Sequence, residues 1–118
     1  LFGRTREALR ELFGTAGDVL VLSASGSGAM ESAIVNCFSP GDKVVVVNGG
    51  KFGERWMELA RMYSLEVIEL KVEWGSAVGV EQVEQALNDN ADVRGVLVNG
   101  GGVRAELTKL GFGIREKG

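Results

Sequence analysis

The run Val44-Val45-Val46-Val47 determines how this 118-residue chain is expected to fold. It is apolar on both faces of a pleated strand, a pattern typical of a strand that is covered on both sides within a parallel sheet. Short apolar runs at residues 19–23, 66–70 and 93–98 are also predicted to be strands. Helical patterns alternate with these runs, so the sequence predicts an α/β fold with a mostly parallel sheet flanked by helices.

The segments between the predicted strands show helical periodicity. Apolar residues recur at intervals of three and four along residues 29–38, along the segment after residue 53 and along residues 80–87. Residues 4–13 also have a helical pattern, and residues 48–53 are predicted to be a loop. After three consecutive glycines, Val103 begins a predicted short helix, and residues 112–115 form a predicted small strand.

Composition excludes several classes of function. A net charge of −3 without a Lys/Arg run argues against a nucleic-acid or membrane-surface partner, and no apolar stretch reaches the length of about 20 residues that a membrane span needs. The chain contains no histidine, which removes Ser/His triads and histidine-type zinc sites, and no metal site is predicted. Cys37 is the only cysteine, so we expect a reducing, cytoplasmic environment.

A glycine-rich turn, Ser25-Gly26-Ser27-Gly28, lies between a predicted strand and a predicted helix. Ligands of α/β proteins bind beyond the carboxyl ends of the strands. There the free N–H groups and dipole of a following helix can receive a phosphate dianion. Two interpretations stay open for this turn: a phosphate-binding site, or a connection without a ligand.

Two common phosphate motifs do not fit the turn. A dinucleotide-binding fingerprint requires a third glycine where Glu31 stands, and a carboxylate further along than Asp42. A P-loop requires a Gly-Lys-Ser/Thr sequence, which is missing here. An unrelated nucleotide- or phosphate-binding α/β domain is an alternative interpretation, although the turn matches neither of these motifs.

The residues around the turn resemble a known family. Residues 23–36 read Ser-Ala-Ser-Gly-Ser-Gly-Ala-Met-Glu-Ser-Ala-Ile-Val-Asn, and Phe-Ser-Pro-Gly-Asp-Lys follows at residues 38–43. Together with residues 48–55 and 72–75, they resemble the class V aminotransferases. The resemblance is closest to the alanine–glyoxylate and serine–glyoxylate (serine–pyruvate) branch, and it extends over residues 4–98.

The resemblance implies a fold-type-I enzyme that uses pyridoxal 5'-phosphate (PLP), usually as a homodimer. It implies that Ser25, Gly26 and Ser27 bind the phosphate of PLP and that Phe52 stacks on its ring. An electron-poor ring favours an aromatic face, although Phe52 also has an alternative interpretation as a packing aromatic. The implied reaction transfers an amino group from a small amino acid, such as alanine or serine, to a 2-oxo acid, such as glyoxylate or pyruvate.

The sequence departs from this family after Val98. The family's catalytic lysine and its acidic partner for the pyridinium nitrogen belong to later segments that do not occur here, so no catalytic residue is predicted. Residues 1–98 are interpreted as a partial PLP-binding large domain. Residues 99–118 are interpreted as a tail, with a resemblance to the small carboxyl-terminal domain at 103–114. The alternative to an active transaminase is therefore an inactive, truncated or vestigial PLP- or phosphate-binding module.

Overall fold

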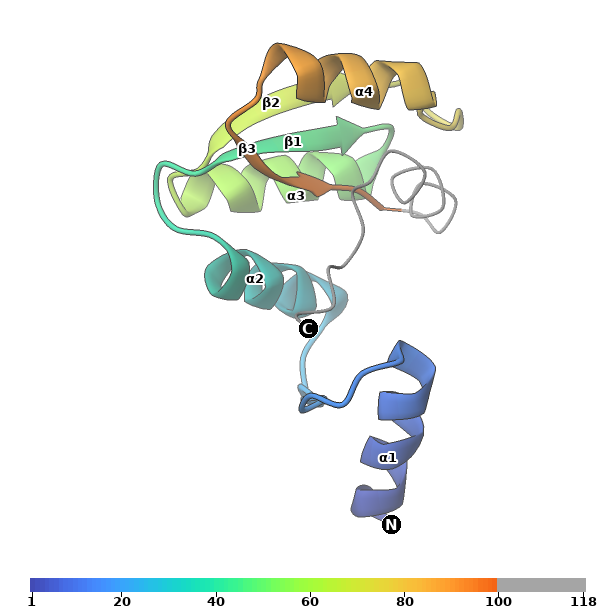
Figure 1. The fold of residues 1–118 in the computed structure, drawn as a ribbon. Helices are drawn as coiled ribbons and strands as arrows, with labels where there is room; N and C mark the ends of the chain where they lie inside the picture. The colour runs from blue at the N-terminus through green and yellow to red at the C-terminus, as the bar shows by residue number, and fades with distance from the viewer. Residues whose placement is uncertain (100–118) are drawn as a thin grey trace.

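The computed structural model describes residues 1–99, in which two helices precede an alternating series of strands and helices (Figure 1). The helices are α1 (Phe2–Phe13), α2 (Gly26–Cys37), α3 (Lys51–Met62) and α4 (Val80–Asp89). The strands are β1 (Lys43–Asn48), β2 (Glu66–Lys71) and β3 (Val93–Leu97). The predicted α/β class is therefore confirmed, and the predicted tail elements at residues 103–110 and 112–115 lie outside the described residues.

The strands form one parallel sheet in the order β2-β1-β3. The central strand β1 contains the valine run, and Val45 pairs in register with Ile68 of β2 and Val96 of β3. Residues 44–48 are all buried. The prediction that the valine run is a strand covered on both faces is thus confirmed.

Successive valines of β1 face opposite layers of the fold. Val44 and Val46 lie in a core cluster with Leu59 of α3, whereas Val45 lies in a second cluster with Val83 of α4. Figure 1 shows α4 on one side of the sheet and α3 on the other, with α2 beyond α3. The side-chain alternation of one strand therefore sets the layer order of the fold.

The predicted strand at residues 19–23 is wrong. These residues have no strand structure, and Leu20 is 77% exposed. A strand needs backbone hydrogen bonds to a neighbouring strand. Within residues 1–99 the sheet ends at β2 and β3, and neither pairs with this segment. The apolar run therefore lies as irregular chain between α1 and α2.

The predicted loop at residues 48–53 is shorter than expected. Asn48 still belongs to β1 and α3 begins at Lys51, so only Gly49 and Gly50 connect them. Gly53 explains how the helix can begin so close to the strand. A Cβ atom on Gly53 would lie 2.7 Å from both the Cα of Asn48 and the carbonyl oxygen of Val47. Only glycine allows this close backbone approach.

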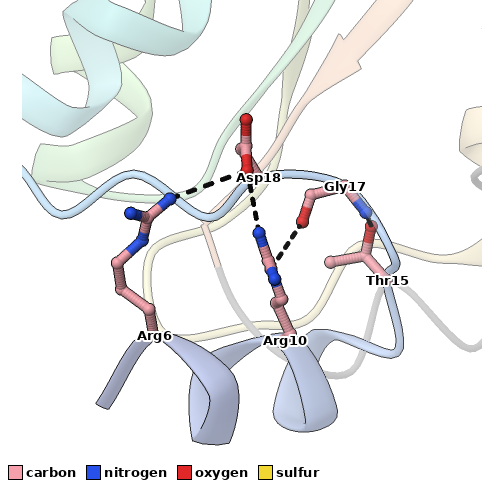
Figure 2. A network of polar contacts seen from close by, with 5 residues as sticks. All are labelled: Arg6, Arg10, Thr15, Gly17 and Asp18. Atoms are coloured by element: carbon pink, nitrogen blue, oxygen red, sulfur yellow. Dashed lines mark hydrogen bonds and ion pairs between the residues drawn. The ribbon is translucent and has the colours of Figure 1, made fainter. Parts of the chain in front are cut away.

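Helix α1 stands apart from the layered core and has no buried residue (Figure 1). A polar network ties its exposed side to the following turn (Figure 2). Nη2 of Arg10 lies 2.8 Å from Oδ1 of Asp18, and the Nη2 of Arg6 lies 3.6 Å from the same oxygen. Arg10 also donates from Nε to the carbonyl oxygen of Gly17. Exposed ion pairs of this kind contribute about 0–1 kcal/mol each, so they hold α1 only loosely.

No helix among residues 1–99 combines the length and the apolar character needed to cross a membrane.

Lys43 joins all three strands at the amino end of the sheet. Its Nζ lies 2.8 Å from Oδ2 of Asp92, just before β3, and 3.6 Å from Oε1 of Glu66, the first residue of β2. Lys43 is therefore engaged with two carboxylates and is not a separately solvated charge. The hydrogen bond from Lys43 lowers the pKa of the Asp92 carboxyl, and the same bond raises the pKa of Lys43.

The substitution Gly53→Ala tests the close approach of α3 to β1. We expect it to lower the free energy of unfolding by about 1–3 kcal/mol, the usual cost of overpacking against groups that cannot move aside. Gly50→Ala is the matched control, because a Cβ atom at Gly50 meets nothing within 4 Å. Urea unfolding measures both variants, and equal stability losses would contradict the steric role of Gly53.

The contact of Lys43 with Asp92 predicts a specific acid sensitivity. A carboxyl with a lowered folded-state pKa stabilises the fold above its unfolded-state pKa of about 3.9, and this stabilisation disappears as the pH falls through the folded-state pKa. The wild-type chain should therefore lose more free energy of unfolding than Lys43→Met between about pH 5 and pH 2. Lys71→Met, at an exposed position of β2, should keep the wild-type pH dependence. If Lys43→Met also kept the wild-type pH dependence, the ion pair of Lys43 with Asp92 would not contribute to the acid sensitivity of the fold.

Candidate functional site

Ser25 is the N-cap residue of α2. Its backbone is extended (φ −70°, ψ 168°), and its Oγ accepts a hydrogen bond from the N–H of Gly28 with an N–O distance of 3.3 Å. Its carbonyl oxygen accepts from the N–H of Ala29. Because Oγ acts here as an acceptor, the hydroxyl hydrogen is still free to donate to another group. Ser25 therefore starts the helix and also offers a donor beside it.

The first turn of α2 is open to an incoming group. Gly26 and Ser27 are its first two residues, and their N–H groups point out of the helix because no preceding turn supplies acceptors. A Cβ atom on Gly26 would meet no atom within 4 Å, and the first turn has no acidic residue. The positive end of the α2 dipole is thus uncovered and uncompensated within the described residues, which favours an anion.

Gly28 has a steric role rather than a direct binding role. A Cβ atom at this position would lie 2.8 Å from the Cβ of Ala24. Since real Cβ atoms do not approach this closely, only glycine allows residue 24 to fold back over the first turn of α2. The two glycines of the turn therefore differ: Gly28 permits the backbone geometry, and Gly26 leaves space above it.

Phe52 is the second residue of α3, and its side chain is 60% exposed. It belongs to neither core cluster, so the structure does not support a packing role for it within residues 1–99. In Figure 1, α2 and α3 both begin at the end of the fold where β1 finishes. The structure thus brings Ser25, Gly26 and Ser27 together in one turn and places Phe52 at the start of the adjacent helix.

The described lysines do not form a reactive site. Lys43 is paired with two carboxylates, and Lys71 is exposed. Nζ of Lys51 lies 3.2 Å from Oε2 of Glu54 and 5.5 Å from the ring centroid of Trp74. A nucleophilic lysine needs a lowered pKa, whereas the hydrogen bond to Asp92 raises the pKa of Lys43. The described residues also contain no group of three metal-binding side chains.

Sequence reasoning missed two contacts near the candidate site. One is the cation–π contact of Lys51 with Trp74. The other is a hydrogen bond in which the hydroxyl of Tyr63 donates to the carboxylate of Glu31, and this bond joins α3 to α2. No local pattern could indicate either contact, because each pair is far apart in the sequence.

Sequence comparison relates most of the chain to known proteins, although no family model matches it. The chain is 33% identical over 124 aligned residues to a protein of Anabaena cylindrica named soluble hydrogenase 42 kDa subunit, covering all of the chain and 32% of that protein. It is 35% identical to the serine–glyoxylate aminotransferase of Methylorubrum extorquens over 95 residues, covering 78% of the chain and 24% of that enzyme. The chain thus spans a third or less of the length of these relatives.

Solved structures share its fold as well. A Thermus thermophilus aspartate aminotransferase matches with a TM-score of 0.64 and 42% identity, covering 68% of the chain and 23% of that structure. An alanine–glyoxylate aminotransferase of Nostoc sp. matches with a TM-score of 0.70 and 25% identity, covering 90% of the chain and 31% of that structure.

The substitution Ser25→Ala tests the cap of α2. We expect it to lower the free energy of unfolding by about 1 kcal/mol, the usual cost of losing a serine N-cap, whereas Ser25→Gly should cost only a few tenths. Ser23→Ala, in the exposed chain before the turn, is the control and should leave stability unchanged. The cap assignment fails if Ser25→Ala is as stable as Ser23→Ala in urea unfolding.

Proposed function

Because this chain belongs to the alanine/serine–glyoxylate branch of the aminotransferases over the part of their length that it spans, we propose that it contributes the phosphate-binding part of a PLP-dependent transaminase. The proposal includes the finer assignment to class V and fold type I. It also divides the chain into a partial PLP-binding large domain at residues 1–98 and a tail at residues 99–118.

The observation that carries the proposal is the open first turn of α2. Among residues 1–99, the first N–H groups of the helix, the hydroxyl of Ser25 and the helix dipole converge where a Cβ atom on Gly26 would meet no atom within 4 Å. A phosphate monoester carries close to two negative charges at neutral pH and accepts several hydrogen bonds. Charge-assisted bonds of this kind contribute about 1.5–3 kcal/mol each. The residues present therefore fit the phosphate of PLP.

Phe52 supplies the second element of the proposal. Its exposed ring at the start of α3 offers an apolar face to a flat heterocycle, and such stacking contributes about 0.5–1.5 kcal/mol beyond burial. When bound, PLP supplies the electron sink that amino-group transfer requires. The proposed substrates are a small amino acid, such as alanine or serine, and a 2-oxo acid, such as glyoxylate or pyruvate.

A second candidate function is a binding module without chemistry. The described lysines favour it, because Lys43 and Lys51 are engaged with carboxylates and Lys71 is exposed. In this alternative the chain would bind PLP through its phosphate without forming a covalent bond. Both candidates share the α2 site and differ only in whether a lysine attaches the cofactor.

The hydrogenase name of one relative does not fit the chemistry of this chain. A nickel–iron or iron–sulfur centre is held mainly by cysteine thiolates. This chain contains one cysteine and no histidine, and Cys37 is exposed. Its own residues therefore offer no thiolate set for such a centre.

The proposal also includes a homodimer in the cytoplasm. Apolar side chains at Phe13, Leu20, Val21 and Leu22 are more than half exposed, and exposed apolar surface of this kind favours association with another protein surface. The single free cysteine fits a reducing compartment.

Substitution of Ser25 by Asp tests the phosphate site without removing the helix cap. Aspartate caps helices about as well as serine, but its negative charge would repel a phosphate. We expect Ser25→Asp to weaken PLP binding by at least about tenfold, the loss of one charge-assisted hydrogen bond, in equilibrium dialysis. Pyridoxal, which lacks the phosphate, should bind weakly to both proteins.

Ser23→Asp is the matched control, because it adds the same charge to exposed chain two residues earlier. Unchanged PLP affinity in Ser25→Asp would place the phosphate elsewhere. Intact mass after borohydride treatment separates the two candidate functions, since only covalent attachment leaves PLP on the chain.

A further inference from the structure

Few contacts hold α2 against the rest of the fold. Ile34 is its only buried residue, and Met30 is partly buried against the same core cluster, which includes α3 residues. The hydrogen bond from Tyr63 to Glu31 is the only side-chain hydrogen bond between α2 and another element among residues 1–99. Among the described residues, the direction of α2 therefore depends on a small apolar contact and on this one directional contact.

Glu31 lies where it can orient the first turn of the helix. It follows Ser27 by four residues, so the two lie on the same face of α2, one turn apart. Apolar contacts alone allow a helix to rotate or slide slightly, because they have no preferred direction. A hydrogen bond has a preferred angle as well as a preferred distance, and this one fixes the face of α2 that bears Ser27.

The partner of Glu31 is itself firmly placed. Tyr63 is the C-cap residue of α3, its N–H donates to the carbonyl oxygen of Leu59, and its ring packs against the core cluster that contains Leu59 and Ala60. The hydrogen bond to Glu31 raises the pKa of Tyr63, so the phenol stays protonated and able to donate at neutral pH. Tyr63 thus connects the middle of α2, one turn after Ser27, to the helix that packs on the sheet.

We propose that Glu31 and Tyr63 are positioning residues for the phosphate-binding turn, which they hold in place by joining α2 to the end of α3. This inference rests on the proposed phosphate site at Ser25, Gly26 and Ser27. It adds that the affinity of this site depends on a contact that touches no ligand. Displacements well below 1 Å are enough to weaken hydrogen bonds to a fixed anion, which is why supporting contacts matter at binding sites.

Phosphate titration of the full chain, followed by nuclear magnetic resonance, tests this inference. Inorganic phosphate should shift the amide signals of Gly26 and Ser27 in the wild type. Tyr63→Phe removes the donor and Glu31→Leu removes the acceptor; each should weaken phosphate binding by about three- to tenfold, the range expected for one net hydrogen bond. Glu31→Gln keeps an acceptor oxygen for Tyr63 and should restore affinity to within about twofold of the wild type.

Two further variants separate positioning from general destabilisation. Tyr63→Phe combined with Glu31→Leu should weaken binding no more than either change alone, because both remove the same contact. Glu58→Gln disrupts an exposed ion pair with Arg55 on α3, and phosphate affinity should not change. If Tyr63→Phe does not fold, Glu31→Leu compared with Glu31→Gln decides the question.

The outcomes distinguish this inference from the proposed function. Wild-type amide signals that do not respond to phosphate would overturn the phosphate site and the inference with it. A responsive wild type whose affinity equals that of Tyr63→Phe and Glu31→Leu would overturn the inference alone. The inference alone would also be overturned if Glu31→Gln bound phosphate as weakly as Glu31→Leu. The hydrogen bond with Tyr63 would then have no role in phosphate affinity.

Discussion

Burial of β1 on both faces is the constraint on which the other elements depend. Each of its fully buried valines contributes about 1.5–3 kcal/mol when it leaves water, and this gain requires cover on both sides of the sheet. Leu59 of α3 provides cover on one side and Val83 of α4 on the other. Because β1 is central, its carboxyl end also fixes the point from which α3 must begin.

The start of α3 shows how tightly the site is linked to this core. Gly53 lets the helix approach Asn48, and the two-residue connection then leaves Phe52 exposed at the end of the sheet. Any larger residue at position 53 would push α3 outward and move Phe52 with it. The ring that is proposed to stack on the cofactor is therefore placed by a steric requirement of the core, not by its own contacts.

Sequence patterns correctly predicted those elements in which the spacing of apolar residues matches the residues that are buried in the structure. The valine run and the helix containing Leu59 were identified because each has an unmistakable apolar pattern. The run at residues 19–23 has an equally apolar pattern, yet it forms no strand. Periodicity reports only which side chains avoid water, whereas a strand also needs a neighbour for its backbone, and no local sequence signal supplies that information.

In the candidate site, too, some features could be predicted from local sequence and others depend on tertiary contacts. The glycine turn was recognisable from its residue types, but the different roles of its two glycines depend on the position of Ala24, which only the three-dimensional structure gives. The network around Lys43 and the contact between Glu31 and Tyr63 were also hidden, because each joins residues that are distant in the sequence. Local patterns thus identify groups that can bind, and tertiary contacts determine whether those groups are held in place.

The absence of a strand before α2 within the described residues makes these tertiary contacts more important. In an α/β protein the strand that precedes a phosphate-binding helix normally fixes the backbone of the intervening turn. Here the chain leading to Ser25 is irregular and exposed, so it cannot fix the turn. The restraint comes instead from the Ser25 cap, the close approach of Gly28 to Ala24 and the contact between α2 and α3. A helix start that must stay uncovered to receive an anion cannot be held by groups that pack over it. It is therefore held by contacts within its own first turn and by the contact of α2 with the neighbouring helix α3.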